Sequence, residues 1–439
     1  MIKRITLALV CAAALSALAA TAFGSTTRSS DEITLTCQRC EASPSDVFSQ
    51  SWYDVVQAFN AKYAGKYKIN VQHFGGRNEN DLQYWERLAL AGSLPDIFIA
   101  QATQLQTLAK TGKLFNFAPA LAADKAWKGS FYAGAFESLT GTKGQIWGIP
   151  EERDNVGIYW NKALFAKAGL RTFPTTWAQF LTACKKLKQA GVIPFAMDGD
   201  WVTQLMWANL IGTQPGGAGF LLSGIKSGNW ATSPRVVKAT EFLKSLHTSG
   251  FVNKDAFSGD YQNAANPFLQ EQAAMIANGP WMVAADIKGA AAKKSLYGHV
   301  AYAPSPGWTK TGQGIIVLNG NAGVASGTSD PAKRAAVIAF QKFATSPAIE
   351  LRRTLKTGAY WSARIKLGPT QIKQLEPVTY RLLQLADRVK YHYEHAKFAT
   401  LQPFTDAWKN YWPAYVQGKL STSAFLKKIA ASAKPTVSG

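Results

Sequence analysis

Few residues of this 439-residue chain could carry chemistry, and they form no familiar catalytic arrangement. The acidic pair Glu151-Glu152 could serve a glycosidase, but that reaction needs two carboxyls about 5–9 Å apart with one raised pKa, and the sequence shows neither. His392 and His395 stand one helical turn apart with no obvious third metal ligand. The sequence contains no phosphate-binding glycine loop, serine-hydrolase elbow or zinc-protease motif. We therefore predict no enzyme activity, no cofactor and no metal site.

The cysteines point to a local crosslink. Cys37 and Cys40 form a single C-x-x-C, and zinc would need two further ligands. A redox C-x-x-C normally opens a helix, whereas this pair follows an expected strand and enters a loop rich in serine and proline. The pair is thus a disulfide candidate. Cys184 lies on the apolar face of an expected helix and is interpreted as a core thiol.

The charge balance is strongly basic. The chain has 48 Lys and Arg against 27 Asp and Glu, which gives a net charge of +21. Hydrophobic residues make up 47% of it, which excludes a disordered chain. Such a charge raises the question of a nucleic-acid or polyanion partner. However, the basic residues occur at most in pairs along the sequence, as on a solvated surface.

The first residues have the pattern of a secretory signal peptide. Lys3 and Arg4 precede an apolar run over 5–20, and Ala20-Thr21-Ala22 is a small-x-small cleavage site. We expect cleavage near Ala22, a solvated linker over 23–31 and a periplasmic protein. Cys11 follows Val10 rather than a small residue, so a lipoprotein is not expected. Export also makes a nucleic-acid partner improbable.

The rest of the chain alternates strand and helix signals. Strands are expected over 33–36, 67–71 and 97–100, and helices over 52–63 and 82–90. This order is typical of an α/β unit with a mostly parallel sheet. A second set follows, with strands over 156–160, 192–196, 315–318 and 323–325, an extended segment over 300–304, helices over 162–168, 176–190, 236–246 and 268–275, and a largely helical remainder from 332 on.

Several short motifs occur in one order between residues 91 and 281, and each resembles a signature of one family. The motifs are Ala91-Gly92-Ser93-Leu94-Pro95-Asp96, Gly144-Gln145-Ile146-Trp147-Gly148-Ile149-Pro150, Tyr159-Trp160-Asn161-Lys162, Pro174-Thr175-Thr176-Trp177, Gln272-Ala273-Ala274-Met275 and Asn278-Gly279-Pro280-Trp281. They are similar to motifs of the extracellular solute-binding proteins of ABC importers. Within these, the chain resembles family 1, the carbohydrate-binding, maltose-binding-protein-like type.

The resemblance implies a periplasmic-binding-protein fold. Two α/β lobes with mostly parallel sheets would be joined by a multi-crossing hinge, with the ligand in the cleft between them. We expect an N-terminal lobe of 32–154 plus 301–350 and a C-terminal lobe of 155–300 plus 351–439. The protein would be a monomer that captures a sugar or oligosaccharide, closes about the hinge and docks on ABC permease membrane subunits.

The resemblance also implies a ligand-binding set, carried over by position. Asp154 corresponds to a carboxylate at the hinge, and Trp281 to a stacking tryptophan. Pyranose C–H faces pack on aromatic rings, and sugar hydroxyls pair with polar side chains. The full predicted set is Arg39, Gln101, Gln104, Arg153, Asp154, Trp201, Asn278, Trp281, Asn321, Trp361 and Phe404.

Three alternatives stay open on the sequence alone. The same fold could bind an anionic ligand, such as a glycerol-phosphate diester or an acidic oligosaccharide, if arginines line the cleft. A secreted carbohydrate-active enzyme would turn over glycans. A polyanion-binding surface protein would lose its partner steeply as salt rises.

Overall fold

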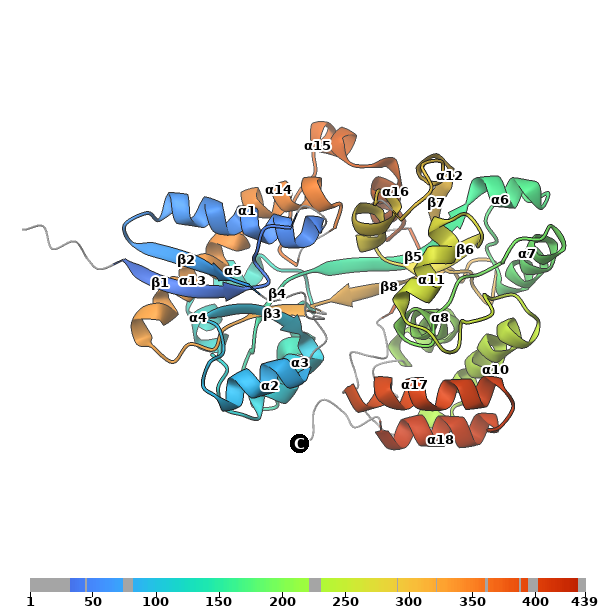
Figure 1. Ribbon diagram of the computed structural model, residues 1–439, viewed down its shortest axis with the longest axis horizontal. Coiled ribbons are helices and arrows are strands. Elements are labelled where there is room, and N and C mark those ends of the chain that lie inside the picture. The colour runs from blue at the N-terminus through green and yellow to red at the C-terminus, as the bar shows by residue number, and fades with distance from the viewer. Residues whose placement is uncertain are drawn as a thin grey trace, which may run out of the picture.

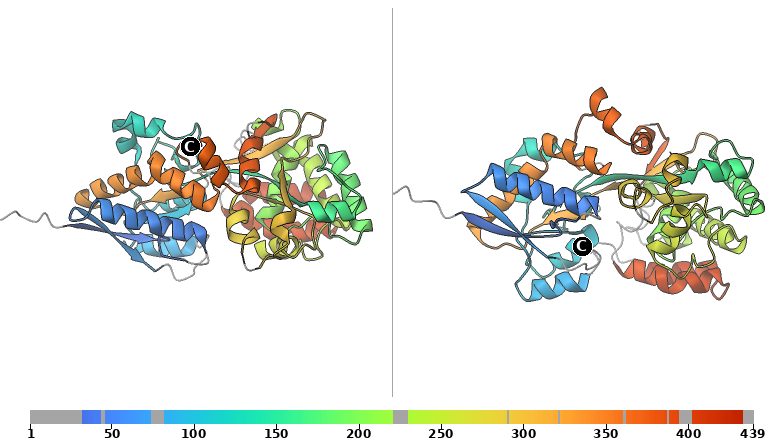
Figure 2. Two further views of the ribbon diagram at one scale, coloured as in Figure 1. Left: turned by 90° about the horizontal axis from the view of Figure 1, so that it is seen from above. Right: turned by 45° about the horizontal axis from the view of Figure 1, so that its top comes forward.

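The computed structural model describes residues 32–43, 46–73, 82–220, 230–289, 291–320, 322–359, 362–386, 388–393 and 402–432. The expected signal peptide and the whole expected linker over 23–31 lie outside the described residues, as do Asn321 and Trp361. Two α/β lobes lie side by side along the long axis of the molecule, as expected (Figures 1 and 2). Each lobe is built on its own sheet.

The first sheet has the strand order β2-β1-β3-β9-β4. Strand β1 pairs in parallel with β2 and β3, while β9 pairs antiparallel with β3 and β4. Its strands are β1 (Ile33–Gln38), β2 (Tyr67–Gln72), β3 (Ile97–Gln101), β4 (Ile149–Pro150) and β9 (Ala322–Ala325). The helices of this lobe are α1 (Val47–Lys62), α2 (Leu82–Leu90), α3 (Ala102–Ala109), α4 (Ala118–Ala123), α5 (Lys125–Gly129), η1 (Glu137–Leu139), α13 (Pro331–Ala344) and α14 (Pro347–Thr357).

The second sheet has the order β10-β8-β5-β6, and β7 pairs with the far half of β5. Its strands are β5 (Arg153–Asn161), β6 (Met275–Asn278), β7 (Val300–Ala303), β8 (Gly314–Asn319) and β10 (Tyr391–Tyr393). The helices that surround it are α6 (Lys162–Lys167), α7 (Trp177–Gln189), α8 (Trp201–Gly212), η2 (Trp230–Thr232), α10 (Pro234–Thr248), α11 (Tyr261–Leu269), η3 (Met282–Ile287), α12 (Leu296–His299), α15 (Pro369–Gln374), α16 (Pro377–Ala386), α17 (Gln402–Val416) and α18 (Thr422–Ser432).

Both sheets are mixed, which corrects the expectation of mostly parallel sheets. Among the strands that the structure describes, parallel pairing occurs in β2-β1-β3 and in the pair β8–β10, and isolated parallel bridges join residues 193–196 to β6 and its surroundings. Three of the antiparallel pairs, β5–β8, β3–β9 and β4–β9, involve strands next to a passage between the lobes, and two more, β5–β6 and β5–β7, lie within the second lobe. Strand β5 enters the second lobe beside β8, which leads back toward the first (Figure 1), so the two neighbours run in opposite directions.

The chain passes between the sheets at three places. The first passage runs from β4 into β5, and the second from β8 into β9. The third follows α14, where Ser362 donates hydrogen bonds to the carbonyls of Glu151 and Glu152. Residues 300–319 therefore belong to the second sheet, whereas the sequence-based division placed 301–350 in the first lobe. Similarly, α14 packs on α1 of the first lobe.

Local sequence explains most element ends. The Asn161 side chain accepts a hydrogen bond from the Leu164 amide at 3.0 Å and caps α6, as its position predicts. Thr176 and Gln179 form a capping box at the start of α7. Two expected elements differ. Residues 192–196 form only isolated bridges, and the helix expected over 268–275 ends at Leu269 because Glu271 takes a positive φ of 55° before β6 begins.

The core of the second lobe holds most of the fully buried tryptophans. Trp177, Trp207, Trp230, Trp408 and Trp412 are each at most 1% exposed. Cys184 lies in the same cluster, as expected of a core thiol. Within the described residues, no helix combines the length and apolar character that a membrane crossing needs.

Candidate functional site

The strand registers bring several predicted residues to the region where the two sheets adjoin. Strands β1 and β3 run in parallel, so Arg39 and Gln101 lie at the same edge of the first sheet. Gln101 pairs with Ala322, the first residue of β9 after the second passage. In the second sheet, Asn278 at the end of β6 pairs with Gly157, in the middle of β5. Carboxyl ends of strands beside a topological switch are where α/β folds bind ligands.

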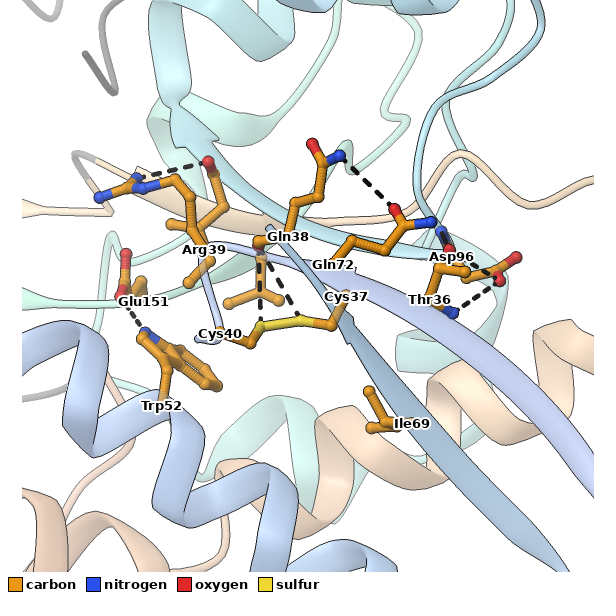
Figure 3. Close-up of a disulfide and its surroundings, with 12 residues drawn as sticks. Thr36, Cys37, Gln38, Arg39, Cys40, Trp52, Ile69, Gln72, Asp96 and Glu151 are labelled. Atoms are coloured by element: carbon orange, nitrogen blue, oxygen red, sulfur yellow. Dashed lines mark hydrogen bonds between the residues drawn. A yellow bond between two sulfur atoms is a disulfide. The ribbon is translucent and has the colours of Figure 1, made fainter. Parts of the chain in front are cut away.

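Arg39 is positioned by the crosslinked loop after β1. The structure joins Cys37 and Cys40 in a disulfide, and Arg39 lies between them with a positive φ of 64°. Its guanidinium Nη1 donates to the Ile99 carbonyl at 3.4 Å, so the side chain reaches across the end of β3 (Figure 3). The loop thus presents a half-buried cation at the edge of the first sheet.

Gln101 and Gln104 occupy the start of α3. The Gln101 amide donates to Oε1 of Gln104 at 3.1 Å, and the two residues form a capping box. Gln104 is only 3% exposed. The structure therefore gives Gln104 a role in starting the helix, while Gln101 is half-buried at the strand end.

Asp154 sits in the first passage between the lobes and is 1% exposed. Its Oδ1 has no hydrogen-bond partner in the described structure. Burial raises the pKa of Asp154 to about 7; a hydrogen bond with Glu152 opposes this rise and the charge of Glu151 adds to it. This buried carboxyl is thus an incompletely satisfied polar group at the passage between the lobes.

Arg153 precedes Asp154 and turns to the first lobe. Its guanidinium lies over the ring of Tyr132, 4.5 Å from the centroid, which is a cation–π contact. The side chain is half-buried. The Arg153 cation, at the start of β5 in the second sheet, therefore contacts Tyr132 of the first lobe.

Glu151 belongs to a buried ionic cluster beside the passage. It accepts a hydrogen bond from Nε1 of Trp52 at 2.5 Å and lies 3.8 Å from Nη2 of Arg353 (Figure 3 draws the Trp52 bond). The Arg353 guanidinium packs over the Trp52 ring at 3.9 Å. Burial raises the pKa of neighbouring Glu350 to about 8, although Arg353 opposes this. These groups fasten α1 and α14 to the first passage.

The second sheet presents an aromatic cluster at its edge. Trp201 stacks on Tyr261 with ring centroids 5.1 Å apart and meets Trp281 edge-on at 5.9 Å. All three rings are half-buried. A Cβ at Gly279 would lie 2.2 Å from Cζ3 of Trp281, so the ring can fold over the backbone there only because residue 279 is glycine. Sequence analysis predicted Trp201 and Trp281, and the structure brings them together.

Tyr261 and Asp286 belong to this cluster and were missed by sequence reasoning. The Tyr261 hydroxyl donates to Oδ2 of Asp286 at 2.5 Å and accepts from Nδ2 of Asn278 at 3.3 Å. Burial raises the pKa of Asp286, and the hydrogen bond from Tyr261 opposes the rise. No sequence spacing links positions 201, 261 and 286, so only the fold identifies the group.

Asp198 fixes the start of α8 and thereby the position of Trp201, the first residue of that helix. Its Oδ1 accepts from the amides of Asp200 and Thr203, each at 3.0 Å, and Oδ2 accepts from that of Val202 at 3.3 Å. Burial nevertheless raises the pKa of Asp198 to about 7. Unlike Asp154, this carboxylate is well supplied with donors.

Phe404 was predicted to reach the ligand, but the structure places it in the core of the second lobe. It is fully buried in the second lobe, with Trp230 and Trp207 at 6.1 and 6.3 Å between ring centroids. Trp408 of α17 packs on it as well, so aromatic rings from three elements surround Phe404. Asn278 is also fully buried, and its Oδ1 accepts from the Gly279 amide, so it shapes the turn rather than presenting an amide.

The chain is similar in sequence to known solute-binding proteins. A family model described as "Bacterial extracellular solute-binding protein" matches residues 43–350. The chain is 28% identical over 244 residues to a multiple sugar-binding protein of Streptococcus mutans, which covers 53% of this chain and 54% of that protein. It is 26% identical over 164 residues to an sn-glycerol-3-phosphate-binding periplasmic protein of Rhizobium meliloti, which covers 37% of this chain and 35% of that one. The chain thus aligns with about half or less of the length of these curated relatives.

The fold agrees with solved structures over nearly its whole length. A chitin oligosaccharide binding protein superposes with a TM-score of 0.74 at 21% identity, covering 91% of this chain and 98% of that one. This match supports the two-lobe α/β architecture expected from the sequence motifs.

Proposed function

Because this chain belongs to the family of bacterial extracellular solute-binding proteins, we propose that it captures a sugar or oligosaccharide between its lobes and delivers it to the membrane subunits of an ABC importer. It acts as a monomer that binds without catalysis and has no nucleic-acid partner. It is exported with its signal peptide cleaved near Ala22 and without a lipid anchor.

The observation that carries this proposal is the cluster of Trp201, Tyr261 and Trp281. Three half-buried rings meet at the edge of a sheet. Rings that served only as core would be fully buried. Aromatic faces of this kind suit the C–H face of a pyranose ring. The similarity to a multiple sugar-binding protein supports the same class of ligand.

Polar groups of the first lobe and the passage supply the other half of the site. Arg39, Gln101, Arg153 and Asp154 offer donors and acceptors for sugar hydroxyls, and Asp154 has an oxygen free of hydrogen bonds. Pairing of such a buried atom by the ligand gives specificity, because leaving it unpaired costs about 1–3 kcal/mol. Asn321 and Trp361 remain predicted contacts outside the described residues.

Closure follows from the three passages between the sheets. We propose that the lobes rotate about β4–β5, β8–β9 and the segment after α14, so that the two edges meet across the ligand. The strand pairing favours a first lobe that ends at Pro150 and resumes at Ala322.

A second candidate is an anionic ligand at the same place, such as a sugar phosphate or glycerol-phosphate diester. Arg39 and Arg153 favour it, since two guanidinium groups approach the region from different strands. The similarity to a glycerol-3-phosphate-binding protein points the same way.

A thermal-shift screen tests both candidates. Neutral sugars and oligosaccharides form one arm, and sugar phosphates with glycerol-phosphate diesters form the other. A ligand at 100 times its dissociation constant adds about 2.7 kcal/mol to the free energy of unfolding. Stabilisation by a neutral sugar without its turnover supports the main proposal. Stabilisation by phosphorylated compounds alone would replace it by the second candidate, and turnover of a glycan would contradict both.

A further inference from the structure

A groove on the second lobe is separate from the site described above. It lies between α16, strand β7, the end of β5 and residues 171–175, and has a volume of about 550 Å³. Small-molecule sites typically enclose about 300–1,000 Å³. All of its lining residues fall between 160 and 385 in the second lobe, and none belongs to the aromatic cluster or to the polar edge of the first sheet.

The walls of the groove are apolar. Trp160 and Phe173 form one side, with ring centroids 5.9 Å apart, and both rings are half-buried. Val378 and Leu385 also line the groove, two turns apart on one face of α16. These surfaces can hold a ring or a short hydrocarbon chain.

Two arginines belong to the lining of the groove. Arg171 lies two residues before Phe173, and Arg381 lies on α16 between Val378 and Leu385, on the same helical stripe. Both are exposed. Within the described part of the chain, neither guanidinium has an ion-pair or hydrogen-bond partner, and no carboxylate lines the groove.

We propose that this groove is a second binding site, for a small anion that carries an apolar group. The two guanidinium groups would pair with a phosphate or carboxylate, a geometry that arginine favours through its fork of donors. The ring or chain of the ligand would lie against Trp160, Phe173, Val378 and Leu385. This proposal does not depend on what the lobes capture between them.

Phenyl phosphate is a suitable probe, because it joins a dianion to a ring. Isothermal titration calorimetry with the mature protein should show saturable binding, with weaker binding of inorganic phosphate and none of phenol at the same concentrations. Arg171→Gln and Arg381→Gln should each weaken phenyl phosphate binding about tenfold, because each removes a charge-assisted hydrogen bond. Arg381→Lys should retain part of the affinity, since the charge remains without the fork.

Arg388→Gln is the matched control. Arg388 is exposed and lies just beyond the end of α16, outside the groove lining, and the change removes the same charge. It should leave the affinity unchanged. The unfolding midpoints of all variants should match that of the parent, since exposed side chains are replaced.

Three results would overturn the proposal. The first is the absence of saturable binding of phenyl phosphate. The second is equal weakening by Arg388→Gln, which would mean general attraction to a basic surface. The third is unchanged affinity in both Arg171→Gln and Arg381→Gln. That result would mean that phenyl phosphate binds at another site, such as the one between the lobes. Affinity for the sugar found in the screen should be the same in all these variants, so the two proposals fail independently.

Discussion

The two sheets end in different chemistry where they adjoin. The first sheet presents Arg39 and Gln101, whereas the second presents the rings of Trp201, Tyr261 and Trp281. Hydrogen-bonding groups give direction and specificity, and aromatic faces give contact area with little directional demand. A ligand that touched both would need a polar rim and apolar faces, as a pyranose has. Neither lobe alone therefore supplies both the hydrogen-bonding groups and the aromatic faces that the proposed sugar recognition needs.

The passage between the two edges offers the largest expected effect on stability. Burial raises the pKa of Asp154 to about 7 in the folded protein, well above the usual value of 3.8 for an aspartate, so the folded state resists ionisation. Stability is then full below about pH 4, falls as pH rises through the interval up to about 7, and stays low above it. Asp154→Asn removes the ionisation. It should raise the free energy of unfolding at pH 8 by about 2 kcal/mol and leave it nearly unchanged at pH 4.

Urea unfolding of both proteins at the two pH values measures this effect. Asp198→Asn is the contrasting variant, because Asp198 has a similar pKa but accepts three backbone hydrogen bonds that Asn cannot all accept. It should destabilise the protein at both pH values. A pH-independent effect of Asp154→Asn would show that Asp154 is ionised in the folded state.

Loss of the aromatic edge should weaken binding most. Trp281→Ala removes a face that we assign to the sugar and should raise the dissociation constant about 30- to 100-fold, or about 2–3 kcal/mol. Titration with the sugar found in the screen measures it. Trp308→Ala is the control, since Trp308 is also half-buried in the second lobe but packs against Lys238, 3.8 Å from its ring centroid. An equal loss in both variants would argue against a stacking role.

The polar edge should contribute less for each residue. Arg39→Gln removes a charged donor and should weaken sugar binding about tenfold. Arg87→Gln, an exposed position on α2, removes the same charge from the same lobe and should have no effect. If the ligand is anionic instead, Arg39→Gln should cost more than Trp281→Ala, which reverses the order of the two edges.

Tyr261 gives the smallest and most selective test. Tyr261→Phe keeps the ring under Trp201 but removes the hydroxyl that donates to Asp286. The ring cluster then loses one anchor, and affinity should fall about fivefold, or about 1 kcal/mol. Tyr297→Phe, at an exposed position of the same lobe, should be neutral. A complete loss of binding in Tyr261→Phe would mean that the hydroxyl contacts the ligand directly.

Much of the fold followed from local sequence. The exceptions are segments whose structure depends on pairing with strands distant in the chain. Helices such as α2 and α7 lie where periodicity and capping residues put them. The direction of β7 and β8 and their membership of the second sheet depended on pairing with β5, a strand far away in the chain. Residues 192–196 resemble a strand in composition, but their neighbours allow only isolated bridges.

Some residues of the candidate site could also be predicted from local sequence. Trp281 could be found because it follows a short motif after a strand, and Trp201 because it opens a helix after an acidic loop. Phe404 looked equivalent and is buried, because the rings of Trp207, Trp230 and Trp408 pack around it. Sequence analysis cannot tell an aromatic that faces solvent from one that faces another helix when both have the same spacing.

The sequence by itself determined the family, the two-lobe architecture and the residue types available for binding, because short motifs and hydrophobic periodicity are local properties. The tertiary structure decided which residues meet. Tyr261 stacks on Trp201 and bonds to Asp286, and the buried carboxyl of Asp154 has an oxygen without a partner. Burial and pairing depend on contacts between segments distant in the chain, and those contacts exist only once the sheets are assembled.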